Sequence, residues 1–246
     1  MKILLAPSET KTSGGEGFFS LDSLFLKSLF SSRKELIEHY QHTIETAEIE
    51  LLSSMFGLKK ESEILRYKQD LFKQPTMKAI ERYTGVAFDY LDYRTLKDDA
   101  KAYLGEHLIL FSNLFGVLQA HDMIPDYRLQ QNKPIGTIKP DKYYKPLLQK
   151  ELGDYLLGEE VLDLRATFYN KYYSPLQPYT ILKFIKEGKV VSHWAKAYRG
   201  IVLREIAKNK IESLDAFVKL PIKGLQIKEI QKQKNRTEII YDIISV

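Results

Sequence analysis

The chain has 246 residues, of which 44% are hydrophobic and none is cysteine, and 37 basic against 32 acidic residues give a formal charge of +5. This length allows one large domain or two small ones, and the missing cysteines exclude disulfides, thiolate zinc sites and cysteine-bound iron–sulfur clusters. The mild basic excess permits an anionic partner without requiring one, so the distribution of the charges has to decide.

The first part of the chain begins with a short buried strand and is then mostly helical. Ile3 to Ala6 predicts the strand, and this apolar run is too short for a signal peptide because Pro7 ends it. Helical spacing follows from Leu21 to about Phe72, with a stop at Gly57. No run approaches the roughly 18 consecutive apolar residues of a membrane span. We therefore expect a cytoplasmic protein that does not contact membranes.

Residues 75–104 have the local pattern of a helix–hairpin–helix. One short helix is expected from Pro75 to about Tyr83 and another from Leu96 to Leu104, with the glycine-centred turn 83–88 between them. Such a turn places backbone N–H groups against a phosphate, which makes Gly85 a candidate nucleic-acid contact. The alternative is a turn that only connects two helices.

The second part of the chain alternates strands and helices irregularly. Continuous apolar runs at Leu108–Phe111 and Val161–Leu164 predict interior strands, and residues 119–144 between them are expected to form a long, ordered, irregular loop. A hairpin is expected around Glu187–Gly188, and two strands separated by a polar turn lie between Leu225 and Ile243. The whole pattern predicts a mixed α/β fold (mixed α+β), with a mixed central sheet surrounded by helices.

Residues 191–204 predict the end of a strand followed by a helix with a cationic face. At about 100° per residue, Arg199 lies about 60° to one side of Lys196 and Arg204 about 80° to the other, so the three cations share one arc. Gly200 costs roughly 1 kcal/mol of helix propensity and is easiest to explain by a close approach of backbone or ligand. The alternative is an ordinary amphipathic helix with a solvated basic face.

Polar residues follow the first strand, at the end where open α/β sheets usually bind ligands. They are Ser8, Glu9, Thr10 and Lys11. A carboxylate beside an ammonium group can act as an acid/base pair or clamp a phosphate, and the alternative is a turn with a surface ion pair. The sequence contains no P-loop, GxGxxG, HExxH or GxSxG motif.

Two further loops combine cations with aromatic rings. Arg128 beside Tyr127 suits phosphate recognition by a planar donor fork and an aromatic face. In residues 163–173, basic and aromatic side chains interleave around Tyr169, as in a surface that stacks bases, although tyrosine-rich loops also pack against cores. If these loops, the first strand end and the cationic helix converge, they form one basic cleft lined by aromatic rings.

Metal ligation has weaker support. His121, Asp122, Asp126 and Glu9 offer hard oxygen ligands and one imidazole for iron, but a His-Asp pair is more often hydrogen-bonded within a loop. The pair His39 and His42 is compatible with a shared metal, yet surface histidines are the better interpretation. We expect neither a resident metal nor a cofactor.

Three ordered blocks of residues resemble the YaaA family of bacterial peroxide-stress proteins. The family's turn after the first strand corresponds to Pro7–Lys11, and its Leu-Tyr-Gly-Val-Leu…Asp…Pro-Tyr-Arg-Leu block corresponds to Leu114–Leu118, Asp122 and Asp126–Leu129. Its Ala-Lys-x-x-Arg-Gly helix corresponds to Ala195–Gly200. The chain departs from the family's Asn-Leu-Ala-Ser-x-Glu-Tyr pattern, because Phe168 stands where many members carry the acidic residue.

The resemblance extends over essentially the whole chain and implies one domain over residues 1–246 with a positively charged cleft. It also implies a helix–hairpin–helix near Tyr83–Phe88, binding to duplex or distorted DNA, and a role in limiting iron-dependent oxidative damage.

Three hypotheses about function follow. The favoured one is a cytoplasmic DNA-binding protein of the peroxide-stress response, whose phosphate contacts are Lys11, Arg128, Lys196, Arg199 and Arg204, with Tyr127 and Tyr169 stacking on bases. The second is an enzyme acting on a nucleotide or nucleic-acid base, because a carboxylate amid cations suits chemistry better than passive binding; its candidate catalytic residues are Glu9, Lys11, Tyr169 and Lys196. The third is direct sequestration of iron.

Overall fold

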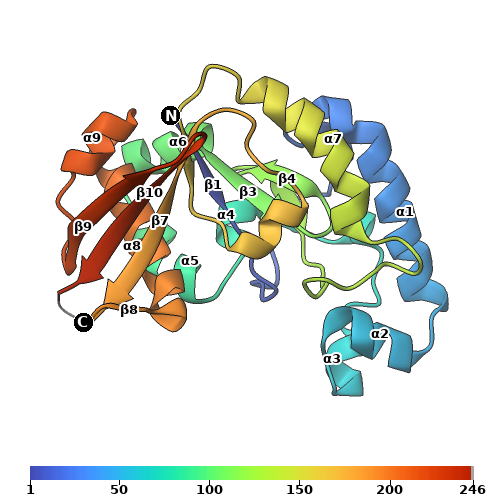
Figure 1. Ribbon diagram of the computed structural model, residues 1–246. Coiled ribbons are helices and arrows are strands. Elements are labelled where there is room, and N and C mark those ends of the chain that lie inside the picture. Colours follow the sequence, from blue (N-terminus) through green and yellow to red (C-terminus); the bar gives the residue numbers. More distant parts are fainter. Residues whose placement is uncertain (245–246) are drawn as a thin grey trace.

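The computed structural model describes residues 1–244, apart from the side chains of Ser192 and His193. Its main sheet has the strand order β4-β3-β1-β6-β7-β10-β9, with β8 paired to β7 (Figure 1). The strands of this sheet are β1 (Lys2–Leu5), β3 (Leu108–Ser112), β4 (Gly116–Gln119), β6 (Val161–Asp163), β7 (Tyr179–Lys186), β8 (Lys189–Val190), β9 (Leu225–Lys232) and β10 (Arg236–Ile243). A separate two-stranded sheet pairs β2 (Thr76–Lys78) with β5 (Met123–Pro125).

The centre of the main sheet is parallel and its margins are antiparallel. Strands β3, β1, β6, β7 and β10 run parallel to their neighbours, whereas β4 pairs antiparallel with β3 and β9 with β10. Strands β1, β3 and β6 are mostly apolar, and Ile3 and Leu4 of β1 are fully buried, as expected for parallel strands covered on both faces, whereas β7 and β10 also carry charged residues. The mixed α/β fold with a mixed central sheet is confirmed.

Helices cover the sheet and extend beyond it. They are α1 (Phe30–Thr46), α2 (Ile49–Phe56), α3 (Glu61–Leu65), α4 (Ala79–Arg82), α5 (Val86–Leu91), α6 (Asp98–His107), α7 (Pro140–Tyr155), α8 (Ser192–Asn209) and α9 (Leu214–Lys219). Short 3-10 helices lie at Leu21–Ser23, Lys27–Leu29, Leu71–Lys73, Tyr93–Thr95 and Thr167–Lys171. Helix α7 packs beside β4, and α8 packs beside β7 and α5 (Figure 1).

The position of β1 in the sheet determines where a ligand can bind. From β1 the chain continues to β3 on one side, and β6 later takes the place on the other side, so the strand order reverses at β1. In open α/β sheets the crevice at such a reversal, beyond the carboxyl ends of the strands, is the usual ligand site. The loops after β1 and β6 are therefore expected to border a pocket.

Several predicted elements are confirmed by the structure. Residues 108–112 and 161–163 are strands, β9 and β10 form the expected C-terminal pair, and Gly57 ends α2 in the left-handed conformation with φ 65°. The hairpin between β7 and β8 turns at Glu187 and Gly188, which have φ of 51° and 77°. Positive φ at both positions is the signature of a tight two-residue hairpin turn.

Two predictions about local structure were wrong. Residues 119–144 are not one irregular loop, because they contain β5 and the first turn of α7, which begins at Pro140. The expected helix from Pro75 begins instead with strand β2, and only the single-turn α4 precedes the Gly85 turn. The turn leads directly into α5, so only the first predicted helix, shortened to α4, flanks it, and the second one corresponds to α6, which comes after α5. A phosphate-binding role for this turn stays a prediction.

Candidate anion-binding site

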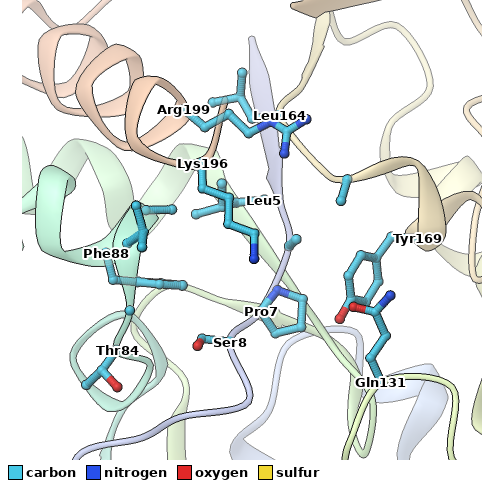
Figure 2. A pocket seen from close by; sticks show the side chains of 15 residues that line it. Leu5, Pro7, Ser8, Thr84, Phe88, Gln131, Leu164, Tyr169, Lys196 and Arg199 are labelled. Carbon is cyan, nitrogen blue, oxygen red and sulfur yellow. The ribbon is translucent and has the colours of Figure 1, made fainter. Parts of the chain in front are cut away.

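A cavity of about 300 Å³ lies at the carboxyl ends of β1 and β6 (Figure 2). Its walls come from the loop after β1, the loop after β6, the Gly85 turn with α5, and α8. The lining residues are Leu5, Ala6, Pro7, Ser8, Thr84, Gly85, Val86, Ala87, Phe88, Gln131, Leu164, Ala166, Tyr169, Lys196 and Arg199. The site is where the reversal of strand order predicts it.

The loop after β1 is fastened to the Gly85 turn by hydrogen bonds. Thr84 N donates to Thr10 O at 3.1 Å, and Thr10 Oγ1 donates to Thr84 O at 3.3 Å. Gly85 has φ 105°, and a Cβ at this position would lie 3.2 Å from Ser8 Oγ. A glycine is needed here for both its backbone conformation and the close approach to the loop.

Two cations enter the cavity from α8. Figure 2 shows Lys196 and Arg199 extending from this helix toward the residues that follow β1. Neither side chain has a hydrogen bond or an ion pair within the part of the chain that the structure describes. Burial lowers the pKa of Arg199, and the nearby Asp163 carboxylate opposes that effect. Two unpaired positive charges facing one small cavity favour the entry of an anion.

Close packing of α5 on α8 brings these cations to the cavity. A Cβ on Gly200 would lie 2.1 Å from Ala87 O, well inside ordinary contact. The backbone of α5, and not a ligand, is therefore the close neighbour that the sequence led us to expect at Gly200. Because α5 supplies Val86, Ala87 and Phe88 to one wall, this contact sets the spacing between the wall and the two cations.

Lys11 lies next to the cavity but not in its lining. Its ammonium group donates to Ser8 O and Glu9 O, both at 3.3 Å, and lies 4.0 Å from the centre of the Tyr127 ring. Burial lowers the pKa of Lys11 to about 7, and the nearby Asp126 carboxylate works against that shift. Lys11 thus stabilises the loop after β1 through hydrogen bonds to its backbone, on the side of the loop away from the cavity.

The Glu9 carboxylate is also engaged within the protein. Its Oε1 accepts from the backbone N–H of Gln131 at 3.0 Å, and its Oε2 lies 3.4 Å from Arg128 NH2. Arg128 in turn donates to Phe56 O at 2.8 Å and to Glu9 O at 2.9 Å. The Arg128 guanidinium thus joins the loop after β1 to α2 and does not line the cavity, and its contact with a phosphate stays a prediction.

Two other residues expected to contact nucleic acid, Tyr127 and Arg204, make hydrogen bonds within the protein. Tyr127 is 2% exposed, and its hydroxyl is 2.8 Å from both Tyr83 OH and Ser112 Oγ, so it cannot stack on a base. Arg204 donates to Leu91 O and to Asp92 O, both at 2.8 Å, and thereby holds the end of α5. The three cations of the predicted arc therefore separate into two that face the cavity and one that does not.

The loop after β6 mostly belongs to the core. Asp163 and Arg165 form a buried ion pair of 2.6 Å, and the Arg165 guanidinium lies 4.3 Å from the centre of the Phe111 ring. Tyr169 lines the cavity but is only 3% exposed, and its hydroxyl donates to Asn113 Oδ1 at 3.2 Å. Of the two alternatives that the sequence left open for this loop, packing against the core describes most of its side chains, and a contact of Tyr169 with a base inside the cavity stays a prediction.

The four candidate iron ligands do not come together. Asp122 accepts from the N–H groups of Phe25 and Gln119, and Asp126 pairs with Arg66 at 2.7 Å. His121 Nε2 lies 3.0 Å from Tyr93 OH, and Glu9 is held as described above. Among the described residues, no group of three or more histidine, aspartate or glutamate side chains is arranged to hold a metal ion.

Sequence reasoning missed part of the cavity lining. Gln131 presents a side-chain amide with no partner among the described residues, and Thr84 and Phe88 flank the Gly85 turn. A usable signal was present, because Gln131 follows the Asp126–Leu129 block by two residues and the other two lie within the predicted turn 83–88. What the sequence could not show was that these segments meet.

Fold and site together define a mixed α/β protein with a cationic pocket at a strand-order reversal. A family model described as peroxide stress protein YaaA matches residues 1–231. The chain belongs to the YaaA family of peroxide stress proteins.

Curated relatives cover nearly the whole chain. It is 42% identical to an uncharacterised protein of Campylobacter jejuni, over 99% of this chain and all of the relative. It is 32% identical to a UPF0246 protein of Corynebacterium glutamicum over 98% of this chain, and 26% identical to a UPF0246 protein of Finegoldia magna over 100% of it. Within the described residues, no helix combines the length and the apolar character needed to cross a membrane.

Proposed function

We propose that this protein serves the peroxide-stress response in the cytoplasm by binding DNA, duplex or distorted, and so limits iron-dependent damage to it. The observation that supports this most directly is the pair Lys196 and Arg199, two cations that face the same small cavity and have no hydrogen-bond or ion-pair partner among the described residues. Membership of a peroxide-stress family gives the physiological setting. A phosphate of the DNA backbone is the anion that this pair would hold.

The geometry favours a local contact over a long cationic track. Of the five basic residues expected along a cleft, Lys11, Arg128 and Arg204 are engaged with backbone carbonyl oxygens. Lys196 and Arg199 remain for a ligand. We therefore expect the cavity itself to hold one backbone phosphate between these two cations, with other surface lysines adding nonspecific attraction.

Fluorescence polarisation with duplex, bubble and single-stranded DNA across a salt series tests the proposal. On a log–log plot, each neutralised phosphate contributes a slope of about −0.9, so loss of the one phosphate held by this pair in Lys196→Ala/Arg199→Ala should make the slope about 0.9 less steep. Lys228→Ala is the matched control, because Lys228 is an exposed lysine on β9, far along the sheet from the cavity. Affinity that does not change with salt, or a double variant with an unchanged slope, would contradict the proposal.

A second candidate is catalysis on a nucleotide or nucleic-acid base in the same cavity. It is favoured by Lys11, which lies next to the cavity and donates to the Glu9 backbone carbonyl, because its pKa of about 7 leaves much of its amine neutral near physiological pH. In cells challenged with peroxide, Glu9→Gln and Lys11→Met should then abolish protection while DNA binding persists. Full protection by both variants would exclude these two residues as catalytic groups.

A further inference from the structure

We propose that the cavity receives a single nucleotide unit, its phosphate and its unpaired base together, either swung out of a DNA strand or free in solution. This inference rests on the proposed function, since it specifies what part of the nucleic acid the site takes. The arguments come from the size of the cavity and from the distribution of its lining.

The cavity is too small for stacked or paired bases. Its volume of about 300 Å³ lies at the lower end of the range for small-molecule pockets, roughly 300 to 1,000 Å³. Base pairs within a duplex are enclosed by their neighbours and by two backbones, so none can enter. One nucleotide that has left its stack can.

The lining has a charged side and a neutral side. Lys196 and Arg199 reach in from α8, whereas Tyr169 and Gln131 stand across the cavity from them (Figure 2). A phosphate or sulfate alone would leave the neutral side unused, and an uncharged ligand would leave both cations unpaired. A nucleotide supplies an anion and a polar ring edge at opposite ends.

Apolar walls join these two sides. In Figure 2, Pro7 lies between Lys196 and the Gln131 amide, Leu5 lies beside Lys196, and Phe88 lies on the other side of that lysine. The ring centres of Phe88 and Tyr83 are 5.6 Å apart. Such walls suit the faces of a planar base, because apolar and aromatic surfaces accept every base through its π face.

Gln131 is the side chain best suited to read the base edge. Its amide offers both a donor and an acceptor, and its own backbone N–H is held by Glu9 Oε1, which fixes the residue at the cavity. Removal of the side chain leaves that backbone bond in place. Gln131→Ala should therefore weaken binding of the base without disturbing the bond between Gln131 N–H and the loop after β1.

If the cavity takes up one unpaired nucleotide, the protein should prefer DNA in which moving a nucleotide out of the helix costs little free energy. Unstacking costs least at a mismatch or a bubble, so such DNA should bind about tenfold tighter than a matched duplex of equal length. Gln131→Ala should reduce this preference to about threefold or less, while the salt dependence stays as in the wild-type protein.

The test uses duplexes that carry one 2-aminopurine, matched or mismatched, with polarisation and 2-aminopurine emission read from the same samples. We expect emission to rise on binding to the mismatched duplex, and to rise less with Gln131→Ala but normally with Gln233→Ala. Gln233 is an exposed glutamine in the turn between β9 and β10. A free mononucleotide is then added as competitor.

Each outcome decides between the possibilities. Quenching of the emission by the free mononucleotide places both sources in one site, whereas a rise that the mononucleotide cannot reverse restricts the site to nucleotides within DNA. Tight binding with no change in emission overturns this inference and leaves the proposed function standing. If no DNA binds but the mononucleotide does, in a manner that requires Gln131, the nucleotide site holds and the DNA proposal fails. Binding of neither refutes both.

Discussion

Replacing Gly200 by alanine tests the contact that sets the width of the site. A Cβ at this position would lie 2.1 Å from Ala87 O, whereas ordinary contact begins at 3.4 Å, so α5 has to move away by roughly 1.3 Å. The atom in the way is backbone, not the end of a flexible side chain, so the strain cannot be relieved by a change of rotamer.

The expected cost follows from two opposing effects. Overpacking costs about 3 kcal/mol at the upper end of its usual range, and alanine returns about 1 kcal/mol of helix propensity. The net loss of about 2 kcal/mol should lower the melting temperature by about 4 to 8 °C for a chain of this size. Affinity for DNA should fall as well, because α5 and α8 carry neighbouring parts of the cavity wall, which this strain would displace.

Thermal unfolding followed by circular dichroism measures this, with Gly153→Ala as the matched control. Gly153 is also inside a helix, but a Cβ there meets only Leu176 Cδ1 at 3.3 Å, the end of an exposed side chain. Gly153→Ala should leave the melting temperature unchanged or raise it. If Gly200→Ala raised it to the same extent, the close approach of α5 to α8 would be refuted.

Three further predictions concern the residues that support the site. Arg204→Ala removes hydrogen bonds from the end of α5 and should lower the free energy of unfolding by about 1 to 3 kcal/mol, with DNA affinity unchanged; a large loss of affinity in polarisation would place Arg204 in the binding surface after all. Asp163→Asn leaves the Arg165 charge buried without its partner and should lower the free energy of unfolding, measured with urea, by about 3 to 5 kcal/mol. Adding Arg165→Met to the same chain should restore part of this loss, and an unchanged free energy of unfolding in Asp163→Asn would mean that the buried pair is not formed. The pKa of Lys11 falls from its usual 10.5 to about 7 in the folded protein, so between these values the unfolded state binds more protons and stability should rise with pH, by up to about 1.4 kcal/mol per unit. Urea unfolding at pH 7 and at pH 9 should show this rise in the free energy of unfolding for the wild type and no rise for Lys11→Met. The same change with pH in both proteins would contradict the prediction.

Predictions from sequence succeeded where the information is local. Lys196 and Arg199 share an arc by helical geometry alone, and the apolar runs at 108–111 and 161–164 are long enough to predict interior strands. The rule that open α/β sheets bind ligands beyond the carboxyl ends of their strands singles out Ser8, which lines the cavity. These features need only the periodicity of the chain and general rules of sheet topology.

Predictions from sequence were incomplete where the role of a side chain depends on distant segments. Arg128 is engaged by Phe56 O, 72 positions away, and Arg204 by Leu91 O, 113 positions away. The sequence shows a cation in each case, but not the backbone carbonyl oxygen to which it donates a hydrogen bond. Gly200 illustrates the boundary well: its size indicated a close neighbour, and only the fold identified that neighbour as Ala87.

The place of β10 in the sheet has a consequence for how the protein is made. This strand lies between β7 and β9, yet it follows both in the chain. While the ribosome is still producing residues 236–243, β7 is paired with β6 along one edge, and its other edge, which β10 will later occupy, has no partner strand. An open edge of this kind can recruit strands from other chains. The nascent protein is therefore expected to depend on chaperones, or on rapid completion of synthesis, until its last strand closes the sheet.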